Sequence, residues 1–151
     1  MDEKKDIQLQ LITKENVWDI LRLKVDEEQK KFVASNAVSL AEALVENRAW
    51  YRAIYAGDEP VGFVMLHIDE EKPEYSLWRF MIAGEHQRKG YGRVAMMRII
   101  DYVRTIPGAH ELLMSYVPGE GNPSAFYGSL GFVETGEMDG DEVVMRLDIH
   151  P

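Results

Sequence analysis

The amino-acid sequence predicts an α/β (α+β) fold, in which a mixed, mostly antiparallel sheet of about seven strands is flanked by helices. Segments with strand-like and helical periodicity follow one another in the order β-α-α-β-β-β-α-β-α-β-β. The three consecutive strands favour an antiparallel meander, and the helix after them favours a crossover between two neighbouring parallel strands. The chain has 151 residues and no repeat or linker, which predicts a single domain over residues 1–151.

The first third of the chain predicts one strand and two or three helices. Residues 7–12 alternate between apolar and polar, as expected of a half-buried strand. Thr13 can cap the helix that follows, and the highly charged residues 26–31 form a second short helix or a bend. Ser39-Leu40-Ala41-Glu42 has the capping-box pattern and predicts a helix over residues 40–48.

The central third predicts three strands. Residues 50–56 and 61–68 are rich in aromatic and β-branched side chains, and residues 57–60, Gly-Asp-Glu-Pro, form the turn between them. Residues 74–82 form a further strand, which leads into a glycine-containing segment and the next helix. These three strands make up the predicted meander.

The last third predicts the crossover and a terminal hairpin. Apolar residues at helical spacing predict a helix that ends at Pro107-Gly108. A strand over residues 110–117 and a short helix over residues 123–130 follow. Residues 132–137 and 142–148 are expected to pair as a hairpin across an Asp-Gly turn.

Composition and charge limit the function classes. The chain contains no cysteine, which excludes disulfides, thiolate metal sites and a cysteine nucleophile, and fits a cytoplasmic location. The four histidines lack metal-ligand spacing, so no metal is expected. The sequence has neither an apolar signal region nor a run long enough to span a membrane. With 17 basic and 26 acidic residues the net charge is −9, which disfavours nucleic acid as a partner and either favours a small cationic partner or serves solubility.

The segment Gln87-Arg88-Lys89-Gly90-Tyr91-Gly92-Arg93 lies between a predicted strand and a predicted helix. The first N–H groups of a helix have no internal partner, and the glycines let an anion approach the main chain. Three cations in the segment can add charge-assisted contacts. A P-loop pattern is absent, and Ala95 leaves only a weak match to the dinucleotide-binding fingerprint. We therefore expect a pyrophosphate site, with a simple helix start as the alternative.

Two sequence patterns resemble the GNAT N-acetyltransferase family. Gln87-Arg88-Lys89-Gly90-Tyr91-Gly92 is similar to its Gln/Arg-x-x-Gly-x-Gly/Ala signature, and Phe126-Tyr127-Gly128-Ser129-Leu130-Gly131-Phe132 is similar to its Phe/Leu-Tyr-x-x-Leu-Gly-Phe segment. The resemblance covers essentially the whole chain and implies the GNAT fold with acetyl-CoA as co-substrate. It implies that the loop holds the pyrophosphate, that Phe80-Met81-Ile82 bonds the pantetheine arm, and that Tyr127 is the general acid.

A closer resemblance concerns the substrate. Residues 28–36 and 39–43, together with Trp78-Arg79-Phe80-Met81-Ile82, are similar to bacterial spermine/spermidine acetyltransferases. This implies acetyl transfer to a primary amine, most simply spermine or spermidine, and a homodimer as the family often forms. Because the chain has no cysteine, direct transfer without a covalent enzyme intermediate is the simpler mechanism. The alternatives are acetylation of an aminoglycoside, a metabolite amine or a protein N-terminus, or a non-catalytic acyl-CoA-binding module.

Acetyl transfer to an amine needs a group that accepts a proton and a group that polarises the carbonyl. Backbone N–H groups near Met81 could polarise the carbonyl. Some relatives carry a glutamate where this sequence has Trp78, so the resemblance leaves the base open. Glu74, Glu28 and Glu120 are the candidates, and a water relay without one dominant carboxylate is an equal alternative.

Several residues are candidates for binding the substrate or the cofactor. Trp78 could stack on an alkyl-ammonium chain, or it could belong to the core. Glu27 and Glu28 could pair with the nitrogens of a polyamine, or they could form a solvated face. Relatives often place an asparagine seven residues before the tyrosine, but Glu120 occupies that position here. Asn122 either makes that pantetheine contact or caps the helix that follows.

Overall fold

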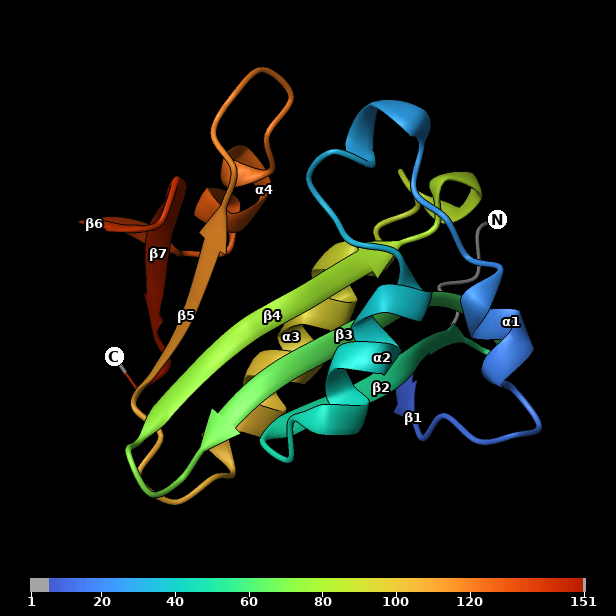
Figure 1. Cartoon of the computed structure of the whole chain (residues 1–151), viewed down its shortest axis with the longest axis horizontal. Coiled ribbons are helices and arrows are strands. Elements are labelled where there is room, and N and C mark those ends of the chain that lie inside the picture. The colour runs from blue at the N-terminus through green and yellow to red at the C-terminus, as the bar shows by residue number, and fades with distance from the viewer. Residues whose placement is uncertain (1–5, 151) are drawn as a thin grey trace.

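A computed structural model describes residues 6–150, shown in Figure 1. Residues 1–5 and 151, which include most of the charged N-terminal segment and both ends of the predicted domain, lie outside the described residues. The helices are α1 (Val17–Leu21), α2 (Asn36–Val45), α3 (Tyr91–Arg104) and α4 (Ser124–Ser129), with 3-10 turns η1 (Glu27–Gln29) and η2 (Gly84–His86). The strands are β1 (Ile7–Gln10), β2 (Ala49–Ala56), β3 (Glu59–Asp69), β4 (Glu74–Ile82), β5 (Glu111–Tyr116), β6 (Val133–Asp139) and β7 (Glu142–Asp148).

The seven strands form one sheet in the order β1-β2-β3-β4-β5-β7-β6. Every neighbouring pair is antiparallel except β4 and β5, which are parallel and joined by α3. The meander, the parallel crossover and the terminal hairpin are therefore confirmed, and with them the predicted fold class. The last strand, β7, lies between β5 and β6, so the hairpin joins the sheet through its second strand.

Helices cover both faces of the sheet, with α1 and α2 on one face and α3 on the other (Figure 1). Met96, Ile99 and Val103 of α3 are fully buried against one face, and Ile20 of α1 is fully buried against the other. The run 61–66 in β3 is therefore buried almost without interruption, as is typical of a strand covered on both sides. This packing holds β4 rigidly at the centre of the molecule.

Strands β4 and β5 pair over a very short length. Their register includes only Ser76 opposite Leu113, after which the two strands separate toward their C-terminal ends (Figure 1). The pairing of β4 with β3 also shifts register, because Met65 faces Arg79 and Leu66 faces Leu77. Trp78 is the extra residue of this β-bulge. The separation leaves the edge of β4 from residue 77 to 82 without a strand partner on its β5 side.

The start predicted for α2, at residue 40, was wrong. The helix begins at Asn36, and its N-cap is Ser35, whose hydroxyl accepts a hydrogen bond from the Val38 N–H at 3.2 Å. Ser39 lies inside the helix, buried, and its hydroxyl donates to the Ser35 carbonyl at 3.1 Å. The capping-box pattern predicted the cap one turn too late because both serines have a sequence context that suits an N-cap.

Candidate active site

The glycine-containing segment forms a turn between η2 and α3. Gly90 is the N-cap of α3 with φ of 83°, and Arg88 also has a positive φ, of 65°. Left-handed residues in such a turn are typical of concavities in which successive N–H groups converge on an anion. Within residues 6–150 no acceptor takes the N–H groups of residues 88–93. The turn therefore presents free donors at the positive end of a 14-residue helix.

At neither Gly90 nor Gly92 would a side chain clash with neighbouring protein atoms. A Cβ on Gly90 would meet nothing within 4 Å, and a Cβ on Gly92 would make ordinary contacts with Phe126 at 3.6 Å and Ile82 at 3.7 Å. Gly90 is needed for its left-handed backbone. The space beside Gly90 is open to a ligand.

Gln87 has partners within the protein for both its N–H and its side chain. The N–H donates to Gly84, and the side-chain nitrogen donates to the Ile82 carbonyl at 2.8 Å. The side-chain amides of Gln87 and Gln29 also bond reciprocally at 2.8 and 3.1 Å. This pair joins residues 25–34, which contain η1 and which we call the η1 segment, to the start of the loop. Its expected contact with a cofactor stays a prediction.

The three cations of the loop lie in different surroundings. Arg88 and Arg93 line the cleft described next, and Arg93 also donates to the Ser129 hydroxyl at 3.3 Å. Lys89 is exposed and lies over the ring of Tyr91, with its nitrogen 5.9 Å from the ring centroid. Two cations and the free N–H groups can therefore act on the same anion.

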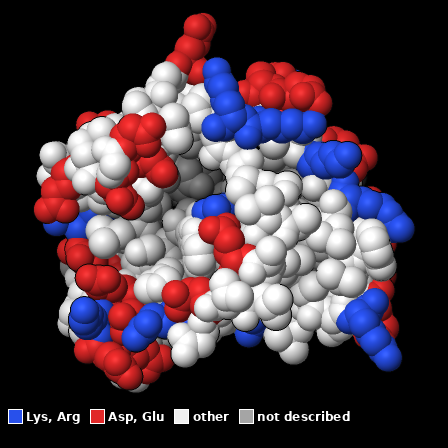
Figure 2. Space-filling model, in the orientation of Figure 1, with Lys and Arg blue, Asp and Glu red and all other residues white. Residues whose placement is uncertain are grey.

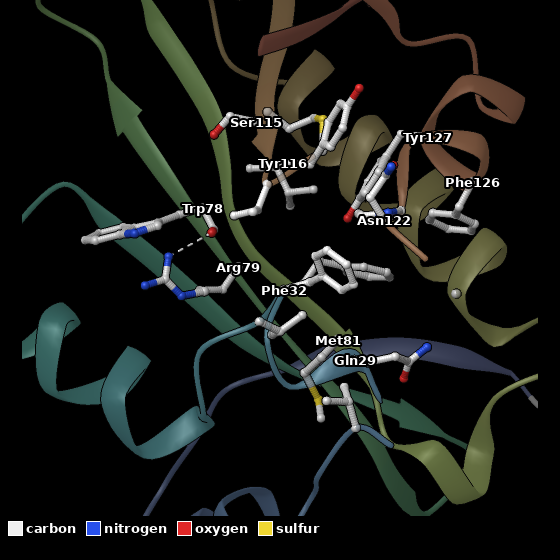
Figure 3. A pocket seen from close by; sticks show the side chains of 18 of the residues that line it. Gln29, Phe32, Trp78, Arg79, Met81, Ser115, Tyr116, Asn122, Phe126 and Tyr127 are labelled. Carbon is white, nitrogen blue, oxygen red and sulfur yellow. Dashed lines mark hydrogen bonds between the residues drawn. The ribbon is translucent and has the colours of Figure 1, made fainter. Parts of the chain in front are cut away.

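A cleft of about 1340 Å³ opens where β4 and β5 separate, and we call it the β4–β5 cleft. Its walls are the edge of β4, the loop before α3, the η1 segment, α4 and the β6–β7 hairpin. Figure 2 shows this hollow on the face of the molecule that carries α2. Figure 3 shows Tyr127 and Asn122 on the α4 side of the cleft, across from Phe32 of the η1 segment. The loop predicted to bind pyrophosphate and the tyrosine predicted to be an acid thus share one cavity.

The free edge of β4 forms the floor of the cleft. Main-chain N–H and C=O groups of alternate residues face the side on which β5 is missing, and Phe80, Met81 and Ile82 all line the cleft. The ring of Phe80 lies nearly parallel to that of Phe126, at 8° and with 6.2 Å between centroids. This edge can accept an extended, amide-containing chain as an added strand would be accepted.

Tyr127 is buried at the inner end of the cleft. Its ring packs edge-to-face against Phe126 at 5.1 Å and Phe132 at 5.6 Å. Burial raises the pKa of the Tyr127 hydroxyl, so the side chain is protonated at neutral pH. A second cleft tyrosine, Tyr116, donates its hydroxyl to Glu134 at 2.9 Å, and this hydrogen bond with burial raises its pKa as well. Tyr127 is therefore available as a neutral hydroxyl donor.

The structure places the predicted carboxylates outside the cleft. Glu74 is exposed at the start of β4, and Glu28 and Glu120 are exposed on the η1 segment and on the loop before α4. Glu27 pairs with Lys30 at 2.6 Å, and the hydrogen bond from that ammonium lowers the pKa of Glu27. None of these four side chains lines the cleft. Their roles as base or amine ligand stay predictions.

Two other predicted residues do line the cleft. Trp78, at the bulge, contacts His67 edge-to-face at 6.2 Å and lies beside Arg79, which is held by Glu42 at 2.7 Å. Asn122 also lines the cleft, but its side-chain oxygen accepts from the N–H of Ser124, the first residue of α4, at 2.9 Å. The N-cap of α4 is Pro123, so Asn122 lies one residue before the predicted capping position and stabilises the turn into the helix, while its contact with pantetheine stays a prediction.

Three acidic residues of the cleft were missed in the sequence. Glu137, Asp139 and Glu142 line it from the β6–β7 hairpin. The hydroxyl of Ser115, at the end of β5, donates to the Glu142 carboxylate at 2.9 Å. The only sequence signal was the high density of acidic residues around the Asp-Gly turn, which equally suits an exposed hairpin.

The charges of the cleft are sorted by wall. Its carboxylates, named above, all lie on the β6–β7 hairpin, and its lysines and arginines all lie elsewhere. These cations are Lys30, Lys31, Arg79, Arg88 and Arg93. Figure 2 shows acidic side chains on the hairpin side of the hollow, and basic side chains accompanied by some acidic ones on the other side. The cleft can therefore hold an anionic and a cationic molecule together in a fixed orientation.

Residues 6–150 offer neither a metal centre nor a helix that could span a membrane. No group of three or more histidine or acidic side chains in this part of the chain is placed to bind a metal ion. None of its helices combines the length and apolar character that a membrane crossing needs.

The fold, the free N–H groups at the start of α3 and the buried tyrosine fit an acyltransferase of the kind predicted from the sequence. The model of the acetyltransferase (GNAT) family matches residues 12–132, and the chain belongs to this family.

Similar proteins include polyamine acetyltransferases. The chain is 26% identical over 151 residues to the spermine/spermidine N(1)-acetyltransferase of Bacillus subtilis strain 168, which covers 93% of this chain and 97% of that protein. The spermidine N-acetyltransferase of Vibrio cholerae, solved with CoA and spermine, has a TM-score of 0.70 at 21% identity, covering 93% and 92% of the two chains. The ribosomal-protein-S18-alanine N-acetyltransferase of Escherichia coli also has a TM-score of 0.70, at 16% identity, covering 95% and 94%. The solved structures show a shared fold.

Proposed function

We propose that this protein transfers the acetyl group of acetyl-CoA directly to a primary amine of a small polycation of the spermine and spermidine class. The observation that carries the proposal is the separation of charge in the β4–β5 cleft. Acetyl-CoA is anionic and a polyamine is cationic, so a cleft with one basic and one acidic wall suits both substrates at once. The similarity to the Bacillus subtilis enzyme supports the same substrate class.

The residues of the loop before α3 suit the pyrophosphate of acetyl-CoA. The N–H groups of residues 88–93 are free to donate, and Arg88 and Arg93 supply positive charge beside them. The pantetheine arm would lie along the free edge of β4 at Phe80, Met81 and Ile82. Phosphate contacts at one end and strand-like contacts along the arm would fix the thioester between β4 and β5.

Residues at the inner end of the cleft would assist the transfer. N–H groups near Met81 would polarise the acetyl carbonyl, and the neutral hydroxyl of Tyr127 would donate to the departing thiolate. Burial makes Tyr127 a weaker acid than a free phenol, so its hydrogen bond to the thiolate is expected to matter before full proton transfer. Trp78 would pack against the alkyl chain of the amine at the mouth of the cleft.

Turnover of acetyl-CoA with a panel of amines tests the proposal. The panel contains spermine, spermidine, an aminoglycoside, a monoamine and a peptide with a free N-terminus. We expect the highest kcat/KM with a polyamine and a Tm raised by CoA but not by NAD or ATP. Preference for the peptide would instead support the same chemistry on a protein N-terminus, and acetylation of none of the amines would refute the proposal.

Two further features stay proposals. We infer a cytoplasmic location, which is supported by the lack of cysteine and by acetyl-CoA as the expected co-substrate. The homodimer expected from the family resemblance would be tested by measuring the mass of the protein in solution by sedimentation.

A further inference from the structure

We propose that Glu142 is the group that accepts the proton from the attacking amine, and that Ser115 positions it. The inference rests on the proposed function, because only an amine substrate needs such a group. It starts from the observation that none of the carboxylates predicted from the sequence reaches the β4–β5 cleft, whereas Glu142 lines it.

The position of Glu142 is fixed by strand pairing. Ser115 lies opposite Val144 in the β5–β7 ladder, and Glu142 is the first residue of β7, two positions before Val144. The Ser115 hydroxyl donates to Oε1 of Glu142 at 2.9 Å across this ladder. A carboxylate offers about four acceptor positions and Ser115 uses one of them, so Glu142 can still accept from an ammonium group.

Glu142 differs from the other two carboxylates of the cleft. Its side chain is half-buried, whereas Glu137 and Asp139 are exposed. Within residues 6–150, no hydrogen bond or ion pair orients the carboxylate of Glu137 or Asp139. A catalytic base must keep one geometry relative to the reacting nitrogen, and a flexible exposed side chain does this poorly. Glu137 and Asp139 are better suited to hold the distal charges of a polyamine.

The location also suits the chemistry. Ser115 is the penultimate residue of β5, next to Tyr116, so Glu142 lies on the β5–β7 wall of the cleft, opposite the free edge of β4, where the acetyl group is expected. The amine would thus lie between the thioester on β4 and the carboxylate on β7. This geometry lets one side chain take the proton while the nitrogen faces the carbonyl carbon.

The ammonium group gives one proton to Glu142, and the nitrogen lone pair then forms the C–N bond with the acetyl carbon as the C–S bond breaks. The thiolate takes a proton from Tyr127, and the second proton lost by the nitrogen returns to the Tyr127 oxygen. Glu142 releases its proton to solvent, so the products are the N-acetyl amine, CoA with a free thiol, and one proton.

The main test compares Glu142→Gln with Asp141→Asn. Both changes remove one negative charge from the same turn, but Asp141 does not line the cleft. Glutamine keeps the shape of the side chain and can still accept from Ser115, so the fold should be retained. At neutral pH we expect Glu142→Gln to lower kcat with spermine by roughly 10²- to 10⁴-fold, and Asp141→Asn to leave it within about twofold.

The pH profile separates loss of a base from loss of charge. A primary amine with a pKa near 10.4 is about one part in a thousand neutral at pH 7.4. Without a base the enzyme depends on that neutral fraction. The kcat/KM of Glu142→Gln should therefore rise about tenfold per pH unit up to pH ~9.5, while that of the wild type stays nearly level.

A second variant tests the positioning role. Ser115→Ala removes one hydrogen bond to a charged group, and we expect about a tenfold lower kcat with a level pH profile and unchanged affinity for CoA. Combined with Glu142→Gln it should cause no further loss, because the hydroxyl acts through the carboxylate. Affinity for CoA and the Tm of each variant show whether the protein is folded.

The outcomes distinguish this proposal from the one on which it rests. If the wild type acetylates none of the amines, the proposed function is refuted and the role of Glu142 with it. If the wild type is active and Glu142→Gln keeps its kcat and its level pH profile, the amine acetyltransferase stands and the role of Glu142 is overturned. Equal losses in Glu142→Gln and Asp141→Asn would also overturn it.

Discussion

The substitution Gly90→Val tests whether the loop before α3 binds a pyrophosphate. Gly90 has φ of 83°, a backbone conformation that a β-branched residue adopts only at a cost of about 1–3 kcal/mol. A Cβ at this position meets no protein atom within 4 Å, so no steric cost from the neighbours is added. For a chain of this size each kcal/mol lowers Tm by about 2–4 °C, so the variant should stay folded at 25 °C.

The expected loss of binding is much larger than the loss of stability. The valine side chain would occupy the open space beside Gly90, next to the free N–H groups of residues 88–93. Hydrogen bonds to a charged group contribute about 1.5–3 kcal/mol each, so losing two of them costs about 3–6 kcal/mol. The dissociation constant of CoA should rise at least about a hundredfold.

Gly108→Val is the matched control. Gly108 follows the other end of α3, has φ of 87°, and would also place a Cβ with no protein atom within 4 Å. The Tm of Gly108→Val should fall by about as much as that of Gly90→Val, but its affinity for CoA should equal that of the wild type. Titration calorimetry with CoA on the three proteins gives the comparison, and equal dissociation constants for the two variants would refute the pyrophosphate site.

Tyr127 and the pair formed by Gln29 and Gln87 give further predictions. Tyr127→Phe should lower kcat by about 10- to 100-fold with little change in CoA affinity, and a wild-type kcat would remove Tyr127 from the mechanism. Because burial raises its pKa in the folded protein, Tyr127 stabilises the fold below pH ~10 and loses this contribution above it, so Tyr127→Phe should show a shallower fall of Tm between pH 9 and 11. Gln29→Ala and Gln87→Ala should show a coupling of about 0.5–1.5 kcal/mol in urea unfolding, and additive effects would show that the reciprocal amide pair is not formed in solution.

Local signals in the sequence predicted most of the sheet. Period-two alternation, the Asp-Gly turn and the apolar spacing in α3 each act within a few residues, and each corresponds to an observed element. The start of α2 was misplaced because Ser35 and Ser39 are both good caps, and only the extended backbone at Ser35 decides between them. That backbone follows from how the segment after η1 packs, which no local pattern contains.

The two sides of the candidate site differed in how far they could be predicted. The loop before α3 is a continuous segment, so its glycines and cations could be read directly. Glu142 and Ser115 are 27 residues apart, and they meet because β7 rather than β6 pairs with β5. A hairpin sequence indicates that two strands pair with each other, but not which of them joins the sheet. The acidic wall of the cleft therefore needed the observed topology.

The short parallel pairing of β4 and β5 connects the fold to the proposed chemistry. Had the two strands paired along their whole length, the edge of β4 would be closed, and Tyr127 and Glu142 would have no common cavity with the loop before α3. Pairing is limited to the region of Ser76, so the β4–β5 cleft has two different walls. One wall is the free edge of β4 beside the start of α3, and the other is β5 bordered by the acidic β6–β7 hairpin. Each wall suits a substrate of opposite charge. If the proposed substrates bind these walls, the separation of charge would orient them with the thioester facing the amine.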